Sequence, residues 1–266
     1  MVSTNVPGTQ TEPNMKPDYE VKLLLNTRAV LTSTNELIDS VLSTFNMPTT
    51  SMKLNFQFLD TNSKDLYTAS WIARIRKPDN QDDFELTYKR RYAISGGNID
   101  AALTAANHDG FNAGSKKYKA QVDWGYSKQT LSISRDKTFA DPKRSKTDLP
   151  GTSDSRKMLI DEAPDKFANW KLDKWGTTVL AESRIFGPLL TRRFIGLWNK
   201  MPLDIEILPI RNLAGTEVDY IVEASFKTKS HTTALTEQSN LAAFLKSKDW
   251  LLAEDSLKTQ LIMDRY

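Results

Sequence analysis

The stretch Asp18-Tyr19-Glu20-Val21-Lys22 alternates charged and apolar side chains. Successive side chains of a β-strand point to opposite faces of the sheet, so Asp18, Glu20 and Lys22 share one face. An ordinary half-buried strand would turn such charges toward water and its apolar face toward the core. This stretch therefore predicts a strand, but it does not decide what its charged face lines.

Two later stretches repeat the alternation with basic residues. In Trp71-Ile72-Ala73-Arg74-Ile75-Arg76 the two guanidinium groups share one face, and the side chains of residues 71, 73 and 75 share the other. Within residues 84–91, one face carries Glu85, Thr87, Lys89 and Arg91. Further charged residues follow in the second half of the chain: Glu182 with Arg184, Arg192 beside Arg193, Asp204 with Glu206, and Asp219, Glu223 and Lys227.

Many short segments of this kind, separated by turn residues, are typical of β-sandwiches and β-barrels. The candidate strands are Tyr19–Leu25, Lys53–Asp60, Trp71–Arg76, Phe84–Arg91, Lys117–Trp124, Gln129–Arg135, Thr177–Phe186, Leu190–Leu197, Leu203–Pro209 and Asp219–Lys227. Apolar residues at helical spacing predict helices at Asn35–Phe45, Ile99–Ala106, Asp165–Lys171, Leu241–Leu245 and Leu251–Met263. Asn98 is suited to cap the second of these.

The predicted helices decide where the charged faces lie. Amphipathic helices need an apolar sheet surface to cover, and if they lie outside a barrel, the charged residues are left inside it. We therefore expect an α+β protein, mainly antiparallel β, folded as a closed barrel of roughly eight strands with helices packed outside. Isolated buried ions are costly, so the acids and bases inside such a tunnel must pair or be neutralised by a ligand and a metal.

The two kinds of charge suit two parts of one ligand. Clustered Lys and Arg suit phosphate, because the planar Arg fork can bind two oxygens at once. Clustered Asp and Glu suit Mg²⁺, a hard ion that keeps phosphate and water oxygens among its ligands. Their coexistence predicts a metal-bound phosphorylated small molecule inside the tunnel.

Composition excludes several other functions. The chain has 266 residues, no cysteine and two histidines, so no thiolate site and no His-rich zinc site can form. A net charge of +3, with both signs abundant throughout, gives no case for bulk nucleic acid as a partner. No stretch reaches the length of an apolar membrane span. We expect a cytoplasmic protein, a monomer or homodimer, that does not bind membranes.

The domain organisation is predicted to be simple. Residues 1–17 are rich in Thr, Pro, Asn and Gly and are expected to be a disordered lead-in. Residues 18–266 are expected to form a single domain, because all-β barrels of this length often do. The polar stretch 137–157, with Pro142, Pro150 and Gly151, is predicted to be a long loop inserted in this domain.

The ordered set of strands resembles the CYTH, or triphosphate tunnel metalloenzyme, superfamily. This superfamily includes inorganic triphosphatases, thiamine triphosphatases, fungal RNA triphosphatases and one class of adenylyl cyclases. Its hallmark first strand, Glu-x-Glu-x-Lys, is similar to residues 18–22, and its Arg-x-Arg strand resembles Arg74-Ile75-Arg76. The resemblance keeps its order from Asp18 to Lys227, through the basic strand that ends at Arg91 and the acidic Asp204-Ile205-Glu206.

The resemblance implies a metal-dependent hydrolase acting on a triphosphate or a related substrate. The metal, Mg²⁺ or Mn²⁺, would be held by Asp18, Glu20 and Glu223. Phosphate oxygens would be bound by Lys22, Arg74, Arg76, Lys89, Arg91, Arg184, Arg192 and Lys227. Asp204 or Glu206 would be the catalytic carboxylate that orients the attacking water.

Two departures from the superfamily pattern keep alternatives open. Asp18 replaces the first glutamate of the hallmark strand, and Ser225 stands where a paired Glu-x-Glu strand would carry its second acid. A lyase or cyclase that releases diphosphate from a nucleotide or an organic diphosphate is one alternative. A non-catalytic binder of phosphorylated ligands is another. An apolar carrier is ranked last, because it would expose the apolar faces of the basic strands.

Overall fold

The computed structural model describes residues 12–140, 146–255 and 258–266. Its strands are β1 (Asp18–Leu25), β2 (Met52–Asp60), β3 (Trp71–Pro78), β4 (Phe84–Ala93), β5 (Lys119–Trp124), β6 (Gln129–Phe139), β7 (Arg184–Trp198), β8 (Met201–Arg211), β9 (Val218–Thr228) and β10 (Leu251–Leu252). Its helices are α1 (Thr27–Val30), α2 (Asp39–Thr44), α3 (Asp65–Thr68), α4 (Ile99–His108), α5 (Thr152–Asp161), α6 (Asp165–Ala168), α7 (Trp175–Glu182), α8 (His231–Ser247) and α9 (Lys258–Arg265).

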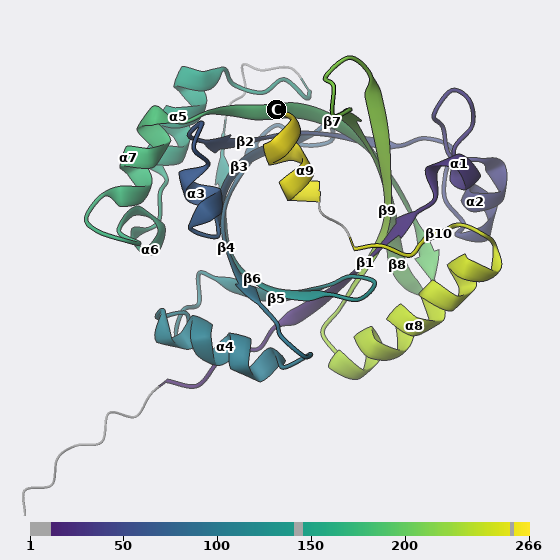
Figure 1. The fold of residues 1–266 in the computed structure, drawn as a ribbon, viewed down its shortest axis with the longest axis horizontal. Coiled ribbons are helices and arrows are strands. Elements are labelled where there is room, and N and C mark those ends of the chain that lie inside the picture. Colours follow the sequence, from purple (N-terminus) through teal and green to yellow (C-terminus); the bar gives the residue numbers. More distant parts are fainter. Residues whose placement is uncertain (1–11, 141–145, 256–257) are drawn as a thin grey trace, which may run out of the picture.

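The strands close into a barrel. Their order is β1-β5-β6-β4-β3-β2-β7-β8-β9, and β9 pairs again with β1, so that nine strands of the described chain form the ring seen in Figure 1. The β1–β5 pair is parallel, and the other barrel pairs of the described residues are antiparallel. The predicted fold, a mainly antiparallel closed barrel with helices outside, is confirmed.

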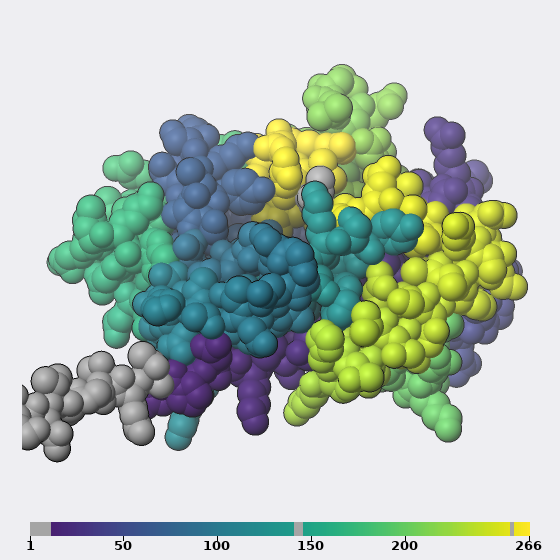
Figure 2. Space-filling view, turned by 60° about the horizontal axis from the view of Figure 1, so that its bottom comes forward, coloured from purple at the N-terminus to yellow at the C-terminus, as the bar shows by residue number. Residues whose placement is uncertain are grey.

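The apolar faces of the strands point outward, beneath the helices. Tyr19, Val21 and Leu23 of β1 are buried, whereas Glu20 and Lys22 line a cavity inside the barrel. Helix α8 contacts β1 and β9, and α4 contacts β4 and β6. Figure 2 shows the side of the molecule on which α4 and α8 lie over the barrel wall. The charged faces are therefore left inside, as the alternation predicted.

Helix α9 is placed differently, because it lies within the ring of strands in the view of Figure 1 and not on its outer face. Ile262 and Met263 of α9 belong to a second apolar cluster. The other buried members of this cluster are Phe56, Phe58, Ile72, Phe186, Leu189, Leu208 and Ile210. Helix α9 therefore packs against an apolar patch on the inner face of the barrel. Among the described residues, no helix combines the length and the apolar character that crossing a membrane requires.

One predicted strand is wrong. Most of Thr177–Phe186 is helical, because α7 runs from Trp175 to Glu182 and β7 begins only at Arg184. The buried residues of α7 are Gly176, Val179 and Leu180, a helical spacing that a period-two interpretation overlooked. Glu182 is therefore at the exposed end of a helix and does not pair with Arg184 across one strand face.

Three predicted helices are shorter than expected, and the one predicted at Asp165–Lys171 ends at Ala168. Helix α2 begins at Asp39, because Leu31 and Leu37 form an isolated β-bridge that takes up the first residues of the predicted Asn35–Phe45 helix. Near the carboxyl end, Leu251–Leu252 pairs with β1 and the helix begins at Lys258. The helix predicted from Ile99 is confirmed and extends to His108, with the Asn98 side chain accepting a hydrogen bond from the Ala101 amide.

The predicted lead-in and loop are partly built into the fold. Residues 1–11 lie outside the described residues, whereas Pro13 accepts a hydrogen bond from the Ala113 amide and Asn14 bonds Thr104. Residues 141–145 of the predicted loop also lie outside the described residues. The loop boundaries are wrong at both ends, because residues 137–139 belong to β6 and residues 152–157 to α5.

Gly196 permits a close approach to the barrel wall. The Leu197 amide donates to the Phe45 carbonyl at 2.7 Å, and a Cβ atom on residue 196 would collide with that carbonyl and with the Met47 side chain. Gly196→Ala is expected to lower the free energy of unfolding by about 1–3 kcal/mol, because the backbone must move. Urea unfolding measures this loss. Gly151→Ala is the control, since open space surrounds that position, and equal losses in the two variants would contradict the prediction.

Candidate functional site

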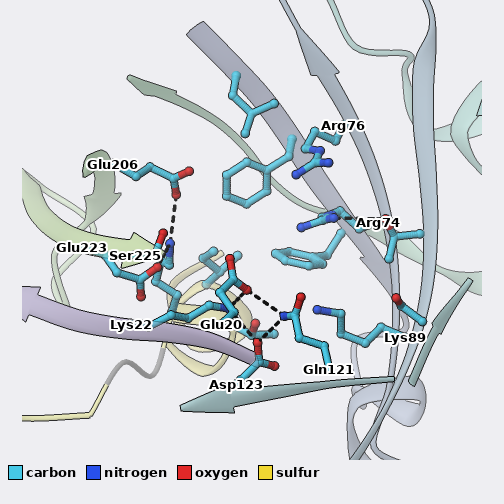
Figure 3. Close-up of a pocket in the computed structure, with 18 of the residues that line it drawn as sticks. Glu20, Lys22, Arg74, Arg76, Lys89, Gln121, Asp123, Glu206, Glu223 and Ser225 are labelled. Carbon is cyan, nitrogen blue, oxygen red and sulfur yellow. Dashed lines mark hydrogen bonds and ion pairs between the residues drawn. The ribbon is translucent and has the colours of Figure 1, made fainter. Parts of the chain in front are cut away.

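A cavity of about 450 Å³ lies inside the barrel. Among the described residues that line it, eight are basic and seven are acidic. Figure 3 shows Arg74, Arg76 and Lys89 reaching from one side toward Glu206 and Glu223 on the other. We call Arg74, Arg76, Lys89 and Arg91, which come from β3 and β4, the basic wall. We call Asp204, Glu206 and Glu223, which come from β8 and β9, the acidic wall.

The basic wall is positioned by strand pairing. Arg74 lies opposite Thr87, and its guanidinium donates to the Thr87 hydroxyl at 3.1 Å. Arg76 lies opposite Glu85 and forms an ion pair with it. Directly opposite residues on paired strands share a face, so the alternation in β3 and β4 sends these side chains inward together.

Lys89 stands out within the basic wall. In the part of the chain that the structure describes, no hydrogen bond or ion pair reaches its ammonium group. Burial lowers the pKa of Lys89 to about 8, with the cations Lys22, Arg74 and Arg91 adding to the effect and Asp123 opposing it. Burial also lowers the pKa of Arg74 to about 10, helped by Arg76. Burial and mutual repulsion destabilise the charged forms of these side chains, so an anion bound between them would stabilise them.

The acidic wall is neutralised by the chain's own cations. Glu206 and Glu223 lie opposite each other on β8 and β9, and the Lys258 ammonium of α9 lies between them, 2.9 Å and 2.8 Å from their Oε1 atoms. Arg193 binds the other oxygen of Glu206 at 3.0 Å. The wall is therefore an ion-pair network and not a cluster of bare carboxylates.

A third cluster joins the two walls across β1 and β5. The Lys22 ammonium lies 2.8 Å from Glu20 and 2.9 Å from Asp123, which also accepts a hydrogen bond from Ser132 at 2.6 Å. Gln121 donates to both Glu20 and Asp123. Although burial opposes charge here, Lys22 and Lys89 hold the pKa of Asp123 well below its usual range. Asp123 therefore stays ionised and fixes Lys22.

Asp204 and Glu206 differ in their readiness to accept a proton. Burial would raise the pKa of Glu206, but Lys258 and Arg193 outweigh it and lower that pKa to about 2. The pKa of Asp204 is raised, chiefly by burial, although Arg193 lies 3.5 Å away. Asp204 is thus the better proton acceptor of the two.

The structure brings ten of the predicted site residues to the cavity. They are Glu20, Lys22, Arg74, Arg76, Lys89, Arg91, Asp204, Glu206, Glu223 and Lys227. Three others lie elsewhere. Asp18 is exposed at the start of β1 and does not line the cavity. Arg184 bonds Asn62 and the Tyr266 carbonyl, and Arg192 forms an ion pair with Glu36.

Strand register explains the misplaced arginine. Arg193 lies opposite Glu206, whose side chain faces the cavity, whereas Arg192 lies opposite Ile207, which is buried on the outward face. Arg193 is therefore the cavity residue of this pair, and the site position predicted for Arg192 is corrected to 193. Arg184 precedes the cavity-lining part of β7 and holds the end of α9, so it is also withdrawn from the predicted phosphate ligands.

Sequence reasoning also missed Asp123 and Lys258 as cavity residues. Asp123 could have been found, because Gln121 and Asp123 form a polar face in a segment that was predicted to be a strand. Lys258 could not, because nothing in the sequence places its helix inside the barrel.

The carboxylates do not fit a divalent metal as they stand. Within the described residues, no three acidic or histidine side chains gather closely enough to hold a metal ion. Lys258 binds the Oε1 atoms of Glu206 and Glu223, and Lys22 binds Glu20 Oε2. Among the described residues, Glu223 Oε2 is buried without a hydrogen-bond partner, and Glu20 Oε1 has only Lys227 at 3.7 Å. These separate oxygens do not form a set of ligands for a divalent ion among the described residues.

No protein-family model matches the chain, and no curated protein matches its sequence. Among solved structures, it is similar to a putative adenylyl cyclase from Hippeastrum with a dominant triphosphatase activity, at 16% identity and a TM-score of 0.50, over 93% of this chain and 96% of that one. It is also similar to a putative adenylate cyclase from Bacillus halodurans, at 11% identity and a TM-score of 0.51, over 92% and 97%. These likenesses concern the fold, which the chain shares with both proteins over more than nine tenths of its length.

Proposed function

We propose that this chain is a phosphohydrolase that binds a triphosphate, or a related phosphorylated small molecule, inside its barrel. The observation that carries the proposal is Lys89, a half-buried lysine that lines the cavity and whose ammonium has no bonding partner among the described residues, beside the desolvated Arg74. Retaining such cations in a closed interior costs stability unless an anion binds there. A chain of phosphoryl groups offers several oxygens to the basic wall at once.

The basic wall would bind and orient the phosphoryl chain. Arginine presents two parallel N–H groups to one phosphoryl group, whereas Lys89 acts as a compact charge. Arg91 also donates to Thr259 of α9, so this end of the wall is fixed before the ligand arrives. Phosphoryl transfer asks little covalent chemistry of the protein, and most of the rate gain comes from positioning and charge stabilisation.

Asp204 would orient the attacking water and accept its proton. The water oxygen forms a bond to the terminal phosphorus, the bond from that phosphorus to its bridging oxygen breaks, and the bridging oxygen keeps the bonding electrons. Orthophosphate and the shortened phosphate chain are the products. Glu206 is not suited to this role, because Lys258 and Arg193 keep its pKa at about 2.

A substrate panel tests the proposal. Inorganic triphosphate, nucleoside triphosphates, thiamine triphosphate and organic diphosphates are offered with EDTA, Mg²⁺ or Mn²⁺, and orthophosphate and diphosphate are measured separately. We expect orthophosphate. The structures named above are called adenylate cyclases, and diphosphate together with a cyclised product would establish that chemistry instead. Binding without any product would establish a binding protein.

The charge of Lys89 predicts a pH dependence of ligand binding. Because its pKa is about 8 in the free protein, the ammonium is charged below that pH and loses its proton above it. Affinity for tripolyphosphate is expected to fall about fivefold between pH 8 and pH 9, since a bound anion keeps Lys89 protonated and binding must then restore the proton that the free protein has lost. Calorimetric titration measures this fall. Lys89→Arg stays charged and serves as the control, so an equal fall in that variant would contradict the assignment.

A further inference from the structure

Lys258 occupies a position where two carboxylates face each other. Glu206 and Glu223 are register partners on neighbouring strands, and the Lys258 ammonium bonds one oxygen of each, at 2.9 Å and 2.8 Å. The two carboxylates stabilise the charged form of Lys258. They raise its pKa above the usual range, although burial alone would lower it. One cation of the chain thus neutralises the centre of the acidic wall.

The helix that carries Lys258 is fixed at several points. Ile262 and Met263 pack in the apolar cluster that also contains Phe56 and Phe58 of β2. Farther along α9, Asp264 pairs with Lys64 at 2.6 Å and Arg265 pairs with Asp219 at 2.9 Å. A side chain on a helix held in this way keeps its position relative to the barrel wall. Lys258 is therefore held in a fixed position in the cavity wall.

A divalent ion would have to compete with this lysine. Mg²⁺ requires oxygen ligands at about 2.0–2.1 Å in nearly octahedral geometry. The two oxygens that face each other already accept hydrogen bonds from the ammonium group, and a metal beside that group would meet like charge in a site partly removed from water. Between these two carboxylates, the oxygen that has no hydrogen-bond partner among the described residues is Glu223 Oε2, a single protein ligand.

We propose that Lys258 replaces the divalent cation between Glu206 and Glu223, so that the tunnel takes its phosphorylated ligand in metal-free form. The statement about the ligand rests on the proposed function, whereas the exclusion of the metal from the acidic wall does not. The substrate class is then a free polyphosphate or phosphate ester and not its magnesium complex. The acidic wall serves to position Lys258 and Arg193, and the basic wall binds the phosphoryl groups.

Metal binding in the absence of phosphate tests the exclusion. Mn²⁺ is titrated into the full chain and followed by the loss of its free-ion electron paramagnetic resonance signal, for the wild type, Lys258→Met and Lys64→Met. Lys258→Met removes the ammonium and keeps an unbranched chain. Lys64→Met removes a lysine that also contacts α9 but does not line the cavity. We expect Mn²⁺ to bind Lys258→Met at least tenfold more tightly than the wild type, with Lys64→Met unchanged. Equal affinities of Lys258→Met and the wild type would overturn the proposal.

The wild-type protein supplies a second test that depends on no variant. Calorimetric titration with inorganic tripolyphosphate is carried out in EDTA and in Mg²⁺, at matched concentrations of the free anion. We expect affinities in EDTA that are no more than threefold weaker than in Mg²⁺, and a larger requirement for the metal would overturn the proposal. Failure to bind in either solution would contradict the proposed function, while the Mn²⁺ titration would still decide the role of Lys258.

Discussion

Replacing Lys89 with methionine is expected to weaken tripolyphosphate binding by about 10–100-fold, the loss typical of one hydrogen bond to a charged group. The same change is expected to raise the free energy of unfolding of the ligand-free protein by about 1 kcal/mol, because it removes a desolvated charge that no described residue pairs. Binding and stability thus move in opposite directions. Calorimetric titration and urea unfolding at pH 7 measure the two quantities.

The control for this variant is Lys117→Met, which removes an exposed lysine that lies outside the cavity. Neither affinity nor stability is expected to change there. If Lys89→Met lost stability as well as affinity, Lys89 would be a structural residue whose ammonium helps to hold the barrel together. The assignment of Lys89 to an anion-binding site would then fail.

Asp204→Asn is expected to reduce turnover by about 10²–10⁴-fold, the range for loss of a general base, while the affinity for the substrate stays within threefold. Asparagine has the shape of aspartate but accepts no proton at neutral pH. Because burial raises the pKa of Asp204, the acid limb of the wild-type pH–rate profile is expected above the ordinary range of an aspartate. Below that limb the carboxyl is protonated and activity is lost.

The substrate used is the best one found in the panel, and single-turnover kinetics separate the chemical step from binding. Asp161→Asn provides the matched control, because Asp161 is exposed on α5 and pairs with Lys157. Unchanged turnover in Asp204→Asn would exclude Asp204 as the base. A loss of affinity as large as the loss of turnover would instead make it a binding residue.

The sequence predicted the walls of the cavity where one kind of residue occupied alternate positions. In β1, β3 and β4 charged residues recur at every second position, so the period of two was sufficient to group the cavity residues, although Lys77 of β3 and Arg90 of β4 lie on the opposite face. It failed at β7, because Arg192 and Arg193 are adjacent and alternation cannot choose between them. The pairing of Arg193 with Glu206 makes that choice, and register between strands is a property of the folded sheet.

Strand β2 shows why α9 was not foreseen. Its inward residues Leu54, Phe56 and Phe58 are apolar, whereas Gln57 on the opposite face is buried and donates to Pro150 and Ser155. The polarity of this strand is thus the reverse of its neighbours'. An apolar patch inside a charged barrel is stable because a helix covers it, but the sequence of β2 does not reveal which helix does so.

The seam between β1 and β9 has a consequence for the order of folding. Tyr19 pairs with Thr228, so the first and last barrel strands meet only after the chain between them has been arranged. Contacts between residues so distant along the chain lower the folding rate. Their entropic cost to stability is smaller, because it grows only with the logarithm of the loop length. Until β1 pairs with β9 and closes the barrel, Glu20 and Lys22 remain hydrated. We therefore expect the tunnel's charges to be desolvated at a late step of folding, after most of the strands that supply their counter-ions are in place.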